Sequence, residues 1–218
     1  LEHMTPVILL TDGYIANGSA PWKIKKTSEL PSITPRIAKT GTTYNPYDRD
    51  EKTLARVLAI PGTPGMEHRI GGLEKDKKTG NISYAPENHE YMVNIRAEKV
   101  KRVQDHIPAI HSEFQEEGDL LVVGWGGTYG SLSAAVSQIN IEGYKVGHMH
   151  LNHINPLPKN VAETMKKFKK IVVCELNKGQ MANVLRMNFP EFQYLQYNKV
   201  QGLPFTTFEL TERFKQLI

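Results

Sequence analysis

Three histidines in the second half of the chain are the first candidates for chemistry. His148 and His150 lie two residues apart in a predicted strand, so they share one face, and His153 follows just past the strand end. Three imidazoles can form a catalytic zinc site, but such sites need convergent geometry and usually carboxylates behind the ligands. The nearest acids in sequence are Glu142 and Glu163. We therefore expect polar residues at the carboxyl edge of a sheet, in a crevice or an interface, and no metal site.

A glycine-rich turn at residues 124–130 precedes these histidines and contains Gly126, Gly127 and Thr128. It follows a predicted strand and opens a helix, which is where a dinucleotide-binding fingerprint would lie. Tyr129 occupies the third glycine position of that fingerprint, and the acidic residue expected about 20 positions later is missing. We interpret the turn as a tight strand-to-helix connection. Its helix N-terminus remains a candidate anion site, and a stand-alone nucleotide-binding protein remains an alternative.

Polar residues also follow the third predicted strand. Glu175, Asn177 and Gln180 lie at a carboxyl strand end, where open α/β sheets bind ligands or partners. The structural alternative has equal support, because Asn177 could cap the helix that begins near Gly179. Asn155 follows the second strand and belongs to the same edge.

Two further residues have simpler interpretations. Lys199 begins a stretch, residues 199–205, with the composition of an exposed turn. Cys174 lies in the middle of a strand, where we expect a buried thiol without reactivity. As the single cysteine of the chain it excludes an internal disulfide, fits a reducing cytoplasm, and cannot hold an iron–sulfur cluster, which typically takes four thiolates.

These residues form one candidate set for a crevice or interface, and we assign a catalytic role to none of them. The set comprises Gly126, Gly127, Thr128, His148, His150, Asn155, Glu175, Asn177, Gln180 and Lys199.

Residues 118–218 contain the elements that must position this set. Apolar strand-like runs alternate with helical patterns at the spacing of an α/β domain, which predicts a three-layer parallel sheet with helices on both faces. The predicted strands are 119–124, 144–151, 171–175 and 192–197, and the predicted helices are 131–141, 160–168, 179–188 and 209–217.

Residues 5–48 lack the strand–helix alternation of that domain. They hold one apolar run, Val7–Leu10, followed by a stretch punctuated by four prolines. A lone buried-type strand needs a sheet to join, and no second strand follows nearby. We therefore interpret this region as the end of a domain whose remainder is missing.

Residues 49–117 are predicted to be a linker with a long helix. The helix begins near Pro86, since proline suits the first helical turn. Val93, Ala97, Val100 and Ile107 recur at spacings of three, four and seven, which predicts that they form its apolar face.

Composition excludes several classes of protein. The chain has 218 residues, of which 39% are hydrophobic and 23% charged, as in soluble globular proteins. No run approaches the roughly 18 apolar residues of a membrane helix. The net charge of +4 is spread over lysine-rich faces and lacks the basic stripe with aromatics of nucleic-acid binders. Residues 1–4 resemble a cloning scar ahead of an internal start, and we expect a cytoplasmic protein.

Several segments together resemble the α subunits of 2-oxoacid:ferredoxin oxidoreductases, particularly the 2-oxoglutarate type. No single motif decides the resemblance, which rests on the order of all of them. Lys75 departs from the family, where histidine is common, and receives no role. The matching segments are Leu10–Asn17 with Ser19–Trp22, then Gly71–Glu74, Gly80, Pro86–His89 and Met92, and finally Glu175, Asn177, Gly179–Gln180, Lys199, Gly202 and Pro204–Phe205.

The resemblance implies a division into three parts. Residues 5–48 would be the end of the pyrimidine-binding domain, 49–117 the linker, and 118–218 a transketolase C-terminal-like domain. It also implies oxidative decarboxylation of a 2-oxoacid to its acyl-CoA, with electrons passed to ferredoxin. Thiamine diphosphate, Mg²⁺ and an iron–sulfur cluster are expected in the full complex and none of them on this chain.

The implied role of this chain is scaffold and subunit interface, inactive alone, as the C-terminal part of an α subunit. Its partners would be the β subunit, with ferredoxin and CoA for the full complex, and a homodimer is also open. A pure dimerisation module remains the other alternative, and we expect neither nucleic-acid nor membrane partners.

Overall fold

The computed structural model describes residues 1–218, apart from the side chain of Ile15. The chain divides into two compact units. Unit 1 consists of Leu1–Ile8 and Pro21–His106, and unit 2 of Leu9–Ala20 and Ile107–Ile218.

Unit 2 is built on a parallel sheet with the strand order β2-β1-β3-β4. Its central strand β1 carries a run, Leu120–Val123, that is fully buried on both faces. Such continuous apolar runs are typical of parallel sheets covered on both sides. The strands are β1 (Gly118–Trp125), β2 (Val146–Leu151), β3 (Phe168–Glu175) and β4 (Tyr194–Asn198).

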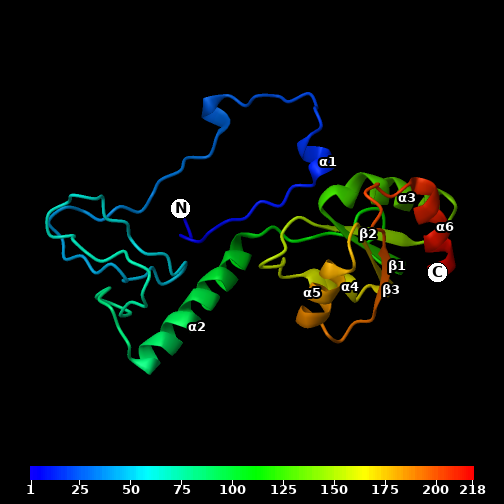
Figure 1. The fold of residues 1–218 in the computed structure, drawn as a ribbon. Coiled ribbons are helices and arrows are strands. Elements are labelled where there is room, and N and C mark those ends of the chain that lie inside the picture. The colour runs from blue at the N-terminus through cyan, green and yellow to red at the C-terminus, as the bar shows by residue number, and fades with distance from the viewer. The chain divides into compact units, whose positions relative to one another are not determined.

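Helices cover both faces of this sheet, α3 and α6 on one and α4 and α5 on the other (Figure 1). Alternate residues of β1 enter the two cores, since Leu120 and Val122 face α3 and α6 while Leu121 and Val123 face α4 and α5. The predicted three-layer α/β sheet is confirmed. The helices are α3 (Tyr129–Ile141), α4 (Val161–Met165), α5 (Gln180–Asn188) and α6 (Thr207–Leu217).

One boundary differs from the sequence prediction. The helix expected over 160–168 ends at Met165, and β3 already begins at Phe168, three residues before the predicted start. The physical reason is pairing, because Phe168 lies opposite Gly118 of β1 and Lys170 opposite Leu120. Pairing with β1 therefore makes the lysine-rich start of β3 a strand, although its sequence alone resembles the end of a helix.

Unit 1 contains the helix α2 (Pro86–Arg102) and short irregular segments joined by isolated bridges. The helix is confirmed, but its predicted apolar face is wrong. Val93 is 45% exposed, whereas Asn88 and Met92 are the buried residues of α2. Asn88 is buried because its amide donates to Lys75 O (2.8 Å) and accepts from Lys77 N (2.9 Å).

The remaining helical segments are single turns. They are α1 (Gly13–Ala16), η1 (Thr27–Glu29), η2 (Val103–His106) and η3 (Gly126–Thr128). Among the described residues, no helix combines the length and the apolar character required to cross a bilayer.

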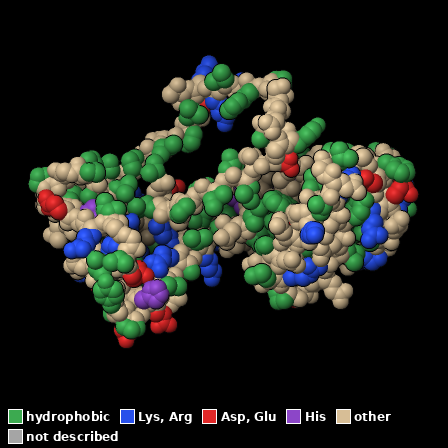
Figure 2. Space-filling view, in the orientation of Figure 1, with side chains coloured by type: hydrophobic (Ala, Val, Ile, Leu, Met, Phe, Trp, Pro, Cys, Tyr) green, Lys and Arg blue, Asp and Glu red, His purple; other side chains and the backbone are tan. Residues whose placement is uncertain are grey.

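The apolar run Val7–Leu10 forms no strand in this chain. Its side chains are between 61% and 90% exposed. Figure 2 shows hydrophobic side chains on the surface of the molecule. The strand predicted here needs a neighbouring strand for its backbone groups, and no described segment pairs with this run, so its pairing with a further domain stays a prediction.

Candidate functional site at the carboxyl edge of the sheet

Unit 2 has a pocket of about 510 Å³ at the carboxyl end of β1 and β3. Five residues of the predicted set line it, together with the segment Leu9–Asp12, Trp125 and Leu176. The five are Gly126, Gly127, Thr128, Asn177 and Gln180. Parallel strands end at one edge of a sheet, which is why residues about 50 positions apart in sequence meet here.

Glu175 lies at the same edge but is fully buried and does not line the pocket. Its carboxylate accepts hydrogen bonds from Met181 N (2.8 Å) and Ala182 N (3.0 Å) in the first turn of α5. It also accepts from Trp125 Nε1 (3.2 Å). Backbone N–H groups in the first turn of a helix have no partner within the helix, and an acid stabilises that end. Glu175 therefore ties α5 to the last residue of β1.

Asn177 supports the same helix from outside. Its Oδ1 accepts hydrogen bonds from Gly179 N (2.8 Å) and Gln180 N (2.9 Å). Gly179 has a φ of +91°, and a Cβ there would lie 2.2 Å from Gln196 Oε1. Asn177 thus satisfies the first N–H group of α5, whose N-cap residue is Gly179, and it also lines the pocket.

Replacing Asn177 by alanine is expected to lower the free energy of unfolding by about 1 kcal/mol, the usual effect of losing a helix cap. Chemical unfolding followed by circular dichroism measures the difference. The matched control is Lys178→Ala, since Lys178 is exposed and should change stability by less than about 0.5 kcal/mol. Equal stability of the two variants would show that the cap contributes nothing.

The glycine-rich turn holds its shape through its own contacts. Thr128 Oγ1 donates to Trp125 O (2.8 Å) and accepts from Trp125 N (3.2 Å). Gly126 has a φ of +58°, which favours glycine. A Cβ on Gly127 would lie 2.9 Å from the carboxylate of Asp12, so Asp12 packs directly on the turn. A phosphate on this turn would meet a carboxylate, and this geometry does not favour the nucleotide-binding alternative.

His148 and His150 lie away from that pocket, in a cluster with Tyr129 and Glu113. Glu113 forms an antiparallel bridge with His148 beside β2. Its carboxylate accepts from Tyr129 Oη (3.1 Å), and the Tyr129 ring lies 5.5 Å and 5.1 Å from the two imidazole rings. The ring of Tyr129 therefore packs against both histidines.

His148 is fully buried, and neither of its ring nitrogens has a hydrogen-bond partner among the described atoms. Its Nδ1 lies 3.6 Å from Glu113 Oε2, which is too far for a hydrogen bond. Burial, with a smaller contribution from His150, lowers the pKa of His148 to about 4. Burial likewise lowers the pKa of His150. Both rings are therefore held neutral near pH 7.

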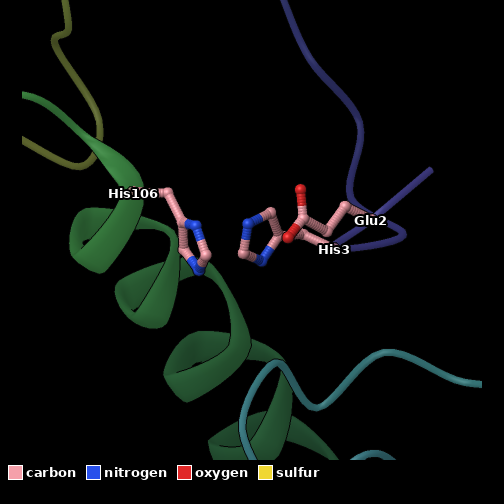
Figure 3. Close-up of side chains that lie close together, drawn as sticks. All are labelled: Glu2, His3 and His106. Atoms are coloured by element: carbon pink, nitrogen blue, oxygen red, sulfur yellow. The ribbon is translucent and has the colours of Figure 1, made fainter. Parts of the chain in front are cut away.

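No metal site forms from the predicted histidine trio in the described part of the chain, and His153 is exposed. One other group could hold an ion by its spacing, namely Glu2, His3 and His106 (Figure 3). The rings of His3 and His106 lie 4.7 Å apart.

The last three predictions concern single residues. Asn155 is exposed in the loop after β2 and does not line the pocket. Lys199 donates to Pro204 O (2.9 Å) and pairs with Glu209 (2.7 Å), so it fixes the turn before α6. Cys174 is fully buried, as predicted, and burial raises the pKa of its thiol, which disfavours the reactive thiolate.

Sequence reasoning missed four residues that shape this edge: Asp12, Glu113, Trp125 and Tyr129. Trp125 and Tyr129 flank glycines in the turn, and their size alone could have singled them out. Asp12 and Glu113 carried no such signal, because they reach the sheet from segments outside the strand–helix alternation.

Comparisons with known proteins agree on one family. The model of pyruvate:ferredoxin oxidoreductase core domain II matches residues 118–209. The chain is 44% identical to the 2-oxoglutarate oxidoreductase subunit KorA of Mycobacterium tuberculosis over 211 residues, which is 96% of this chain and 32% of that subunit. It is 27% identical to the 2-oxoglutarate synthase subunit KorA of Methanothermobacter marburgensis, over 83% of this chain and 48% of the relative.

A solved structure supports the match. It is the 2-oxoglutarate:ferredoxin oxidoreductase of Magnetococcus marinus, with 2-oxoglutarate, coenzyme A and succinyl-CoA bound. The TM-score is 0.80 at 30% identity, over 88% of this chain and 34% of that one. The present chain thus spans between about a third and a half of these relatives. It belongs to the family of 2-oxoacid:ferredoxin oxidoreductase α subunits of the 2-oxoglutarate type and corresponds to part of such a subunit.

Proposed function

We propose that this chain works as part of a thiamine-diphosphate-dependent 2-oxoglutarate:ferredoxin oxidoreductase. The complete enzyme would convert a 2-oxoacid, 2-oxoglutarate above all, and CoA into acyl-CoA and CO₂, with electrons passed to ferredoxin. The observation that carries the proposal is the 44% identity that runs through almost the whole chain. The likeness to an oxidoreductase solved with 2-oxoglutarate and coenzyme A supports the same substrates.

Within that enzyme the chain would act as scaffold and subunit interface. The polar groups at the sheet edge support this role, because Glu175, Asn177 and Thr128 are engaged in hydrogen bonds that shape α5 and the turn. We infer that the exposed run Val7–Leu10 is a strand of the neighbouring pyrimidine-binding domain, to which residues 5–48 would belong. Residues 49–117 would be the linker and 118–218 the C-terminal domain.

The cofactors would be held elsewhere in the complex. An iron–sulfur cluster typically takes four thiolates, whereas this chain offers one buried cysteine, Cys174. Mg²⁺ prefers several oxygen ligands, and the potential ion-binding group of the described residues contains one carboxylate, Glu2. We therefore place thiamine diphosphate, Mg²⁺ and the cluster on other parts of a cytoplasmic complex, with the β subunit as direct partner.

The 218-residue chain alone is expected to show no CoA-dependent oxidation of 2-oxoglutarate, measured by reduction of a viologen dye. The complete α and β subunits together should show turnover, because thiamine diphosphate supplies the chemistry and the protein positions it. Turnover by the chain alone would overturn the proposal.

The strand role of residues 7–10 has a separate test in the complete α subunit. Ile8→Asp places a charge in a strand that would be buried inside the α subunit, and it should reduce the folded α subunit recovered by affinity capture by about ten-fold, as expected for burying an unpaired charge. Ile141→Asp is the matched control, since the two isoleucines are 83% and 78% exposed in this chain. Equal recovery of the two variants would contradict a strand role for residues 7–10.

A further inference from the structure

Unit 1 contains a second pocket, of about 530 Å³, whose lining is strongly cationic. Five of its lining side chains are basic, and Glu74 is the one acid among the described lining residues. The basic residues are Arg49, Arg56, Lys75, Arg96 and Lys99. The whole chain carries a net charge of +4, so this pocket concentrates a local excess that the overall composition does not reveal. Figure 2 shows Lys and Arg side chains on the body that contains α2.

The single acid is already paired. Glu74 accepts two hydrogen bonds from Arg96, at 3.1 Å and 3.2 Å. Its Oε2 also lies 2.9 Å from Nδ1 of His89. The bond from Arg96 is the main reason why the pKa of Glu74 falls to about 2. Glu74 therefore balances Arg96 and leaves the other cations of the pocket without a carboxylate.

Neutral groups hold those other cations in place. Arg49 donates to Tyr47 O (3.0 Å) and approaches Met92 Sδ (3.9 Å), while its Nε is buried without a partner among the described atoms. Arg56 donates to Pro46 O (3.1 Å). Both guanidinium groups lie over the ring of Tyr47, at 5.5 Å and 4.5 Å. Carbonyl oxygens and an aromatic face orient these charges but do not neutralise them.

Lys99 adds a third like charge to the same place. Its Nζ donates to Met4 O (2.7 Å), again a neutral acceptor. Burial, followed by the nearby Arg56 and Arg49, lowers the pKa of Lys99 to about 8. Lys75 is almost fully buried and donates to Gly71 O and Leu73 O. Arg49, Arg56 and Lys99 thus repel one another across a cavity whose one lining carboxylate, Glu74, is already paired with Arg96.

We propose that this pocket binds the phosphate groups of a small-molecule ligand, with Arg49, Arg56 and Lys99 as the direct contacts. Two guanidinium forks and an ammonium suit a multiply charged tetrahedral oxyanion better than a single carboxylate, because arginine pairs with two oxygens at once. The diphosphate class matches the charge of the three contacts. The inference rests on unit 1 alone and is independent of the oxidoreductase proposal.

Isothermal titration of the 218-residue chain with inorganic diphosphate at low ionic strength tests the proposal. One diphosphate should bind per chain, and added salt should weaken the binding. Lys99→Gln and Arg49→Gln should each weaken it by about ten-fold or more, as expected for a hydrogen bond between charged groups. Lys101→Gln is the matched control, since Lys101 lies on the same helix outside the pocket and should leave the affinity within about two-fold.

Thermal unfolding separates binding from a structural role. Without anion, Lys99→Gln should melt at the same temperature as the unmodified chain or higher, because it removes repulsion. The rise in melting temperature caused by diphosphate should shrink in this variant. Absence of binding, an equal loss in Lys101→Gln, or malonate binding as well as diphosphate would overturn the phosphate site. A marked fall in melting temperature for Lys99→Gln without anion would also overturn it, by making the charge structural.

Discussion

Glu175→Ala is expected to lower the free energy of unfolding of unit 2 by about 4 kcal/mol, since it leaves three donors, two of them buried and one partly buried, without a partner. The donors are Trp125 Nε1, Met181 N and Ala182 N, all within 3.2 Å of the carboxylate. Each unsatisfied buried donor costs about 1–3 kcal/mol. A loss of this size is a large part of the 5–15 kcal/mol that stabilise an ordinary domain.

Urea unfolding followed by circular dichroism measures this loss, and tryptophan fluorescence reports the release of Trp125. Glu175→Gln keeps one acceptor oxygen and should lose about half as much. The control is Glu212→Ala on α6, because Glu212 is 52% exposed and lies 3.7 Å from Lys215. That variant should stay within about 0.5 kcal/mol of the unmodified chain. If Glu175→Ala matched it, the carboxylate would not hold α5.

Acidification from pH 6.5 to pH 4 is expected to destabilise unit 2 by up to about 3 kcal/mol through His148. Burial holds the folded-state pKa at about 4, compared with 6.5 in the unfolded chain. Between these values the unfolded chain binds a proton that the folded chain does not, so stability falls as pH falls. His150, whose pKa is also lowered, acts in the same direction.

The groups around His148 are Glu113, Tyr129 and His150, and none of them forms a hydrogen bond with its ring nitrogens among the described atoms. His148→Leu removes the titrating group with a similar volume and should flatten the stability curve between pH 6.5 and 4. His153→Gln removes an exposed histidine and should leave the curve unchanged. Free energies from urea unfolding across this pH range decide the question, and parallel curves for the unmodified chain and His148→Leu would contradict it.

The alternation of strands and helices in unit 2 could be predicted because each element has its own spacing of apolar residues along the chain. Apolar runs such as Leu120–Val123 are long enough to identify strands buried on both faces, and the helix patterns between them fix a parallel sheet. Asn177 before Gly179 predicted the helix cap for the same reason, since a cap depends on residues two or three positions apart. Order along the chain also carried the family resemblance.

At the candidate site, the sequence predicted which strand ends carry polar residues but not which of these residues are buried. Glu175 resembled a ligand-facing acid, yet it is fully buried because the N-terminus of α5 and the indole of Trp125 surround it. His148 was expected at a crevice or an interface but is covered by Tyr129 at the start of α3 and by Glu113, which approaches from outside the strand–helix alternation. Burial of a polar group depends on what packs over it, and sequence spacing does not record that.

The sequence by itself determined the order, type and approximate bounds of the elements in unit 2, because these depend on contacts between near neighbours. Tertiary structure alone decided the cationic pocket of unit 1. Arg49 and Arg56 pair in one isolated antiparallel bridge, whereas Lys99 lies on α2 and is more than 40 positions away, and no motif links the three. Folding brings these like charges together from separate segments of the chain. The repulsion between them depends on their distances in space, which sequence spacing does not give.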